Sequence, residues 1–151
     1  MNNLPIFFST LFGIGYLSKF PGTIASFLSL FLIWYIKINF SEEIIYIIYI
    51  FSLFLSLYFV NKAVNIIRVK DPKIIVVDEY LGQFTALLFC SEKLINYLIA
   101  FLLFRFFDIF KPFPINKIDQ GEASICIILD DIVAGIYAGL TLLLINIFIK
   151  T

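Results

Sequence analysis

Histidine is absent from the chain, and this absence excludes several kinds of chemistry. Ser-His-Asp and Cys-His catalysis, phosphohistidine intermediates and histidine-ligated zinc all need an imidazole group. The two cysteines, Cys90 and Cys126, lie in apolar runs and lack CxxC spacing, which is typical of buried small side chains.

Charged residues are scarce, at 15% of 151 residues, whereas the AVILMFWYC class makes up 62% and the mean hydropathy is +1.02. A typical soluble domain carries about 25% charged residues. So little charge cannot cover a water-facing surface, and the composition predicts an integral membrane protein with one membrane-embedded domain over residues 1–151. Eleven basic and eleven acidic residues give no net charge, so we expect no nucleic-acid partner.

The apolar runs predict the fold, because a spanning helix needs about 20 mostly apolar residues. The clearest spans are residues 24–38, 44–60 and 132–149. Residues 74–107 are interrupted by Ser91-Glu92-Lys93, which predicts a turn between two antiparallel helices. The first of these should run from Pro72 to Phe89 with Asp71 as its N-cap.

The N-terminal stretch 4–17 is too short to span a membrane and lacks the basic start of a signal peptide, so it predicts an interfacial helix. The expected fold is all-α: a small polytopic membrane helical bundle with about four spanning helices plus a short N-terminal interfacial helix. Basic residues cluster in 61–73 and 111–122, which the positive-inside rule places in the cytoplasm. Residues 41–43 and 91–93 should lie on the far side.

Carboxylates inside the apolar segments are the main functional signal. Each costs roughly 2.5–3.5 kcal/mol at the centre of a membrane helix, so such residues are rare and usually functional. Two adjacent pairs occur, Asp78-Glu79 and Asp130-Asp131, and Asp108 lies in a third apolar segment. Capping or interface ion pairing is the simpler alternative, but two adjacent acids exceed what a helix cap requires.

Helical spacing gives the two acidic pairs a common pattern. Gly82 follows Asp78 by four residues, and Gly135 and Gly139 follow Asp131 at the same interval. Stripes of small residues allow close helix approach. We therefore expect the carboxylates to converge inside the bundle, near the cytoplasmic ends of their helices.

Five converging carboxylates cannot all stay ionised unless positive charge is supplied, and Arg105 and Lys111 offset two charges at most. All-oxygen ligands favour Mg²⁺, usually beside a phosphate group. The predicted metal ligands are Asp78, Glu79, Asp130 and Asp131.

A phosphate site is predicted from the remaining polar residues. A glycine-containing loop precedes the first span, and its amides with Lys19 and Thr23 could hold a phosphate at a helix N-terminus. Arg105 lies one helical turn before Asp108, and Lys111 follows just beyond. The predicted phosphate-binding residues are Lys19, Thr23, Arg105 and Lys111. A purely structural loop and a purely structural Arg105–Asp108 pair are the alternatives.

These motifs, in this order, resemble the phosphatidylglycerophosphatase A family. The matching segments are 15–23, 71–83, 104–115 and 130–137. The resemblance implies a bacterial membrane enzyme, and the distribution of basic residues predicts that its active site lies on the cytoplasmic face of the cell (inner) membrane. The resemblance also implies Mg²⁺-dependent hydrolysis of the lipid substrate phosphatidylglycerol phosphate to phosphatidylglycerol and phosphate.

Other phosphatase classes are excluded by the sequence. Type 2 phosphatidic acid phosphatases need histidine, no arginine stands six residues after either cysteine, and the DxDx[TV] pattern is absent. Carboxylate-plus-metal hydrolysis remains, with Asp78 and Asp108 as the predicted catalytic residues. A carboxylate could orient a water molecule or attack phosphorus itself, and the sequence does not separate these routes.

Two functions of other classes stay open. A small transporter or channel would use intramembrane carboxylates as a proton or cation pathway, and it would spread them through the membrane depth. A non-catalytic lipid-binding subunit would leave the paired acids without a role. The sequence does not indicate an oligomeric state.

Overall fold

The computed structural model describes residues 3–17, 19–69, 72–91 and 93–149, and every regular element among them is helical. The elements are α1 (Leu4–Ser9), the 3₁₀ turn η1 (Ile14–Tyr16), α2 (Pro21–Asn39), α3 (Glu42–Ile67), α4 (Val77–Leu88), α5 (Leu94–Phe110), α6 (Ile115–Asp119) and α7 (Ser124–Ile149). The all-α prediction is confirmed, and α1 is the predicted short N-terminal helix.

Three helices of the described residues are long and apolar enough to cross a membrane: α2, α3 and α7. They match the three predicted runs. Large apolar side chains such as Phe31, Phe54 and Ile147 are exposed on their outer sides, as membrane association requires. Helix α5 has 17 residues and is about 26 Å long, so it falls just short of the same length.

Helix α4 is shorter than predicted. It begins at Val77 and not at Pro72, so its 12 residues extend only about 18 Å. The segment before it forms a turn, with the Ile75 amide donating to the Pro72 carbonyl, and the Val76 amide then bonds to the Ser9 carbonyl at the end of α1 (3.0 Å). This tertiary hydrogen bond and the β-branched side chains here compete with helix formation. The predicted cap, Asp71, lies outside the described residues.

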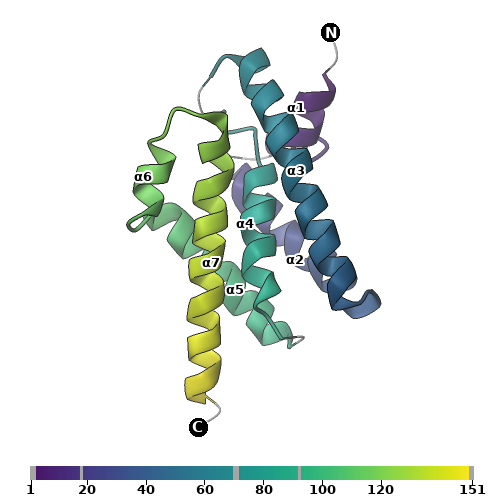
Figure 1. The fold of residues 1–151 in the computed structure, drawn as a ribbon, viewed down its shortest axis with the longest axis vertical. Coiled ribbons are helices and arrows are strands. Elements are labelled where there is room, and N and C mark those ends of the chain that lie inside the picture. The colour runs from purple at the N-terminus through teal and green to yellow at the C-terminus, as the bar shows by residue number, and fades with distance from the viewer. Residues whose placement is uncertain (1–2, 18, 70–71, 92, 150–151) are drawn as a thin grey trace.

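Helix α4 occupies the middle of the bundle, where it contacts α2, α3, α5 and α7 (Figure 1). The small-residue stripes explain how these helices come so close. A Cβ atom on Gly135 of α7 would overlap the Gly82 carbonyl of α4, and a Cβ on Gly139 would overlap the Phe89 ring. The predicted close approach of the two acid-bearing helices is confirmed, and nine of the twelve α4 residues are buried.

The C-terminal end of α4 is capped by Lys37, which lies in the last turn of α2. Its Nζ atom donates hydrogen bonds to the carbonyls of Leu87 (3.0 Å) and Cys90 (2.6 Å). A cation at this position satisfies one carbonyl in the last turn of α4 and one just beyond the helix, and it interacts favourably with the negative end of the helix dipole. Lys37, which interrupts an apolar run in the sequence, therefore fastens α2 to α4.

Candidate functional site

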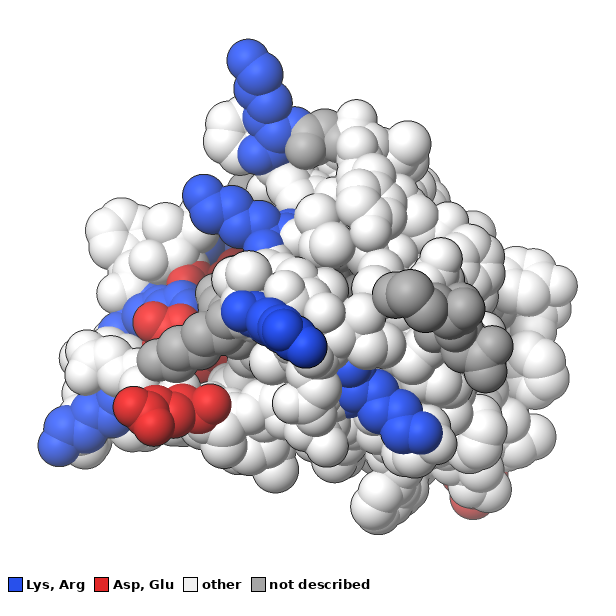
Figure 2. Space-filling model, turned by 90° about the horizontal axis from the view of Figure 1, so that it is seen from above, with Lys and Arg blue, Asp and Glu red and all other residues white. Residues whose placement is uncertain are grey.

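A cavity of about 270 Å³ opens where α2, α4 and α7 begin and α5 ends. Seen from this end of the molecule, acidic side chains gather at one side among basic ones (Figure 2). The cavity is lined by all nine predicted site residues: Lys19, Thr23, Asp78, Glu79, Arg105, Asp108, Lys111, Asp130 and Asp131. Four separate segments of the chain are thus brought to one place.

Three carboxylates form the tightest group in the cavity, which we call the carboxylate triad: Asp78 and Glu79 from α4, and Asp131 from α7. One oxygen of each lies within 4.8 Å of the others. The Oε2 atom of Glu79 is buried and accepts no hydrogen bond from the described residues. Oxygen donors at this spacing, without nitrogen or sulfur, fit a hard divalent cation such as Mg²⁺.

The N-terminus of α2 lies directly against Glu79 of this triad. A Cβ atom on Gly22 would overlap the carboxyl group of Glu79, so a larger residue here would displace that carboxyl group from its present position. The Ser26 hydroxyl donates to the Gly22 carbonyl (2.8 Å) one turn later. The Pro-Gly-Thr sequence therefore has a structural reason beyond loop formation: it brings Thr23 and the first amides of α2 beside Glu79.

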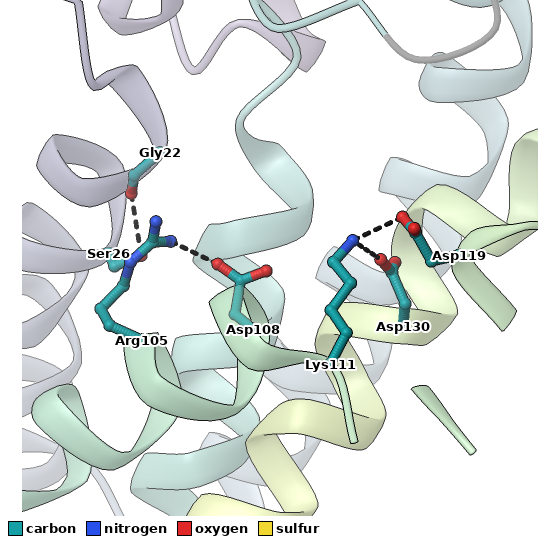
Figure 3. A network of polar contacts seen from close by, with 7 residues as sticks. All are labelled: Gly22, Ser26, Arg105, Asp108, Lys111, Asp119 and Asp130. Atoms are coloured by element: carbon teal, nitrogen blue, oxygen red, sulfur yellow. Dashed lines mark hydrogen bonds and ion pairs between the residues drawn. The ribbon is translucent and has the colours of Figure 1, made fainter. Parts of the chain in front are cut away.

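Arg105 and Asp108 form the ion pair that their spacing predicts. An Nη1–Oδ2 distance of 2.7 Å joins them, and their side chains are 17% and 12% exposed. Figure 3 shows the Arg105 guanidinium between the start of α2 and Asp108. Its Nε atom is buried and donates to no acceptor in the described parts of the chain. The guanidinium therefore keeps a donor for a further acceptor such as a phosphate oxygen.

Lys111 is held by two carboxylates, Asp119 and Asp130, with an Nζ–Oδ2 distance of 2.7 Å to the latter (Figure 3). Partial burial lowers the pKa of Lys111, but the hydrogen bonds to Asp119 and Asp130 outweigh burial and raise the pKa overall. Asp130 is also one of the four metal ligands that the sequence predicts. In the structure Lys111 binds it, and it lies outside the carboxylate triad.

Two charged residues of the cavity were not predicted as site residues, Lys73 and Asp119. For Asp119, in a polar loop, the sequence predicts only a helix cap or an ion pair, and Lys73 is one of several basic residues of the segment 61–73. Neither has a sequence signal beyond its charge, because its position depends on how distant segments pack. With them, six acidic and four basic side chains line the cavity, an excess of two negative charges that one divalent cation would neutralise.

Comparison with known proteins agrees with this geometry. The family model described as "PgpA: Phosphatidylglycerophosphatase A" matches residues 7–146. A Haemophilus influenzae protein named phosphatidylglycerophosphatase A is 35% identical over 84% of this chain and 79% of its own length. The Escherichia coli protein of that name is 28% identical over 83% of this chain and 73% of its own.

A third relative has a different name. A protein of Bacteroides thetaiotaomicron, provisionally named a phosphatidylinositol-3-phosphatase, is 29% identical over 89% of each chain. No solved structure matches the chain significantly.

Proposed function

The chain belongs to the phosphatidylglycerophosphatase A family and is a phosphatase, and we propose that it removes the terminal phosphate of phosphatidylglycerol phosphate to leave phosphatidylglycerol. One observation carries this proposal. The carboxylate triad and the unsatisfied Arg105 donor face one cavity at the end of a membrane bundle. A metal site and a phosphate site in one cavity are what hydrolysis of a lipid phosphate monoester needs.

The proposed metal ligands are Asp78, Glu79 and Asp131. Mg²⁺ bound there would act as a Lewis acid that neutralises charge on the phosphoryl oxygens. Lys111 already neutralises Asp130, so we assign Asp130 to the cavity wall, where it fixes the position of Lys111. Because the ion would be held by residues of both α4 and α7, binding it would require these two helices to lie close together.

The proposed phosphate contacts surround the triad. Arg105 donates to the oxygens of the terminal phosphate, for which its planar group is suited, and Thr23 closes the other side from the start of α2. Lys19 is exposed at the rim of the cavity, where it is the proposed contact for the outer part of the lipid headgroup. Asp108 is fixed by Arg105 and is the proposed residue that orients or deprotonates water. Asp78 is the second proposed catalytic carboxylate. Attack by water and attack by a carboxylate remain alternative routes.

The proposed membrane orientation places the cavity at the cytoplasmic face of a bacterial inner membrane. Lys73 lines the cavity, and several further basic side chains lie on the face of the molecule seen in Figure 2, around the cavity end. By the positive-inside rule this end is cytoplasmic. The cavity would then lie level with the headgroups of inner-leaflet lipids. Accessibility of residue 117 to labelling from outside intact cells would contradict this orientation.

Phosphate release by the purified protein tests the function. We expect release from phosphatidylglycerol phosphate with Mg²⁺, none with EDTA, and a loss of at least about 100-fold in Asp131→Asn, because even groups behind metal ligands contribute 10–100-fold. The matched control is Glu122→Gln, an exposed acid that does not line the cavity. Absence of phosphate release under all conditions would contradict phosphatase activity and favour a transporter or a non-catalytic subunit.

Arg105→Lys separates a phosphate contact from a structural ion pair. Lysine keeps the charge but loses the bidentate donor geometry, so we expect a 10–100-fold loss of kcat/KM with an unchanged melting temperature. Both measurements are made on one purified preparation. A destabilised variant with normal turnover per folded molecule would show that the Arg105–Asp108 pair is structural.

A further inference from the structure

The four basic residues of the cavity fall into two kinds. Arg105 is paired with Asp108, and Lys111 is paired with Asp119 and Asp130. Lys19 and Lys73 line the same cavity and are exposed, and no ion pair or hydrogen bond joins their ammonium groups to the rest of the described chain. Two lysines at the rim of an acidic cavity therefore keep their charge available for an anion from outside.

The two rim lysines are carried by segments that pack against each other. A Cβ atom on Gly15, four residues before Lys19, would overlap the carbonyl oxygen of Ile74, the residue after Lys73. The Val76 amide donates to the Ser9 carbonyl (3.0 Å), which ties the same turn to the end of α1. The segment that precedes Lys19 is therefore in direct backbone contact with the segment that follows Lys73.

The rim lysines are separated in depth from the carboxylate triad. Asp78 and Asp131 are 8% and 4% exposed, whereas both lysines are exposed. An anion that contacts the triad and Arg105 lies inside the cavity, and a second anion attached to it by a short linker would reach the rim. The ammonium group of lysine, a compact charge on a flexible stem, can pair with the single negative charge of a phosphodiester.

We propose that Lys19 and Lys73 bind the phosphodiester group of a lipid that carries two phosphates, while the deeper residues hold the terminal monoester. The inference rests on the proposed function and deepens it. Phosphatidylglycerol phosphate and phosphatidylinositol 3-phosphate both place a polyol between a diester and a monoester phosphate. Phosphatidic acid has no diester group for the rim lysines to bind. Lys73 therefore favours lipids with two phosphates over phosphatidic acid.

Kinetics on short-chain, monomeric lipids test this role without effects of surface charge. We expect Lys73→Gln to lower kcat/KM about fivefold for dihexanoyl phosphatidylglycerol phosphate, mainly through KM, and to leave dihexanoyl phosphatidic acid within twofold. A fivefold change in kcat/KM is about the effect expected from the loss of one solvent-exposed ion pair. Lys73→Arg should restore most of the loss, and Lys117→Gln, an exposed cation outside the cavity, should change neither substrate.

Binding of a diester without a monoester gives a readout that needs no turnover. Dihexanoyl phosphatidylglycerol should bind the wild type about fivefold more tightly than Lys73→Gln, with Lys117→Gln equal to wild type. This binding result would support the inference even if the protein released no phosphate. Absence of phosphate release would contradict only the proposed function. Equal losses on both substrates, or unchanged binding of the diester lipid in Lys73→Gln, would overturn the inference.

Discussion

Helices α3 and α4 differ most in how much of their surface is buried by the rest of the bundle. Helix α3 has 26 residues, of which only Ile45, Ser56, Val60 and Ala63 are buried, and its exposed side chains are mostly apolar. Helix α4 has 12 residues, nine of them buried, and it carries two acids, a glutamine and a threonine. The helix that faces outward is the one that hydropathy finds easily, and the helix that carries the chemistry is shielded by its neighbours.

Shielding explains how α4 tolerates polar groups. Its acids line the cavity at the start of the helix. The Thr85 hydroxyl donates to the Leu81 carbonyl and therefore accepts a hydrogen bond from the Tyr49 hydroxyl of α3 (2.8 Å). A polar side chain in a membrane protein is costly where it meets lipid and much less costly inside the bundle. If this contrast is correct, substitutions should disturb α4 and its contacts far more than the outer side of α3.

The largest effect is expected from Gly135→Val, which places a side chain against the backbone of α4. Because the Gly82 carbonyl cannot move without shifting α4, the variant should lose about 3 kcal/mol of unfolding free energy. Unfolding in mixed detergent micelles measures this. Leu144→Val, at an exposed position of the same helix, is the control. A Gly135→Val protein as stable as wild type would show that the close approach of α4 and α7 is not required.

A smaller effect is expected from Phe84→Ala on α4, compared with Phe54→Ala on α3. Phe84 is fully buried and its ring meets the Tyr49 ring edge to face, at 5.3 Å between centroids, whereas Phe54 is 67% exposed. Lipid is as apolar as a protein core, so only lost packing counts, about 2 kcal/mol for Phe84→Ala and under about 0.5 kcal/mol for Phe54→Ala. Equal losses in the same unfolding assay would contradict the contrast between the two helices.

The smallest of the three effects is expected from Lys37→Met, which removes the cation at the end of α4. Two carbonyl acceptors lose a charged donor, and we expect a loss of about 1–1.5 kcal/mol with activity retained. Lys93→Met tests the same change of charge near that end of the molecule, at an exposed lysine that caps no carbonyl in the described structure. A loss in Lys93→Met as large as that in Lys37→Met would assign the effect to charge and not to the cap.

The sequence was sufficient to predict the all-helical bundle, the three long helices and eight of the ten charged residues that line the cavity. Acids in apolar runs are conspicuous, and glycines at a spacing of four residues predict which helix faces meet. The start of α4 could not be predicted, because it depends on a backbone hydrogen bond between Val76 and the distant Ser9. The partners of Lys111 and the position of Lys73 likewise depend on tertiary packing.

Divalent-cation binding tests most directly whether α4 and α7 share one metal site. Free Mn²⁺, a paramagnetic substitute for Mg²⁺, is counted by its electron paramagnetic resonance signal as purified protein is added. Wild type should bind one Mn²⁺ per chain, displaced by Mg²⁺, and Asp131→Asn should lose this binding, whereas Asp130→Asn, outside the carboxylate triad, should keep it. Unchanged Mn²⁺ binding in Asp131→Asn would contradict the site.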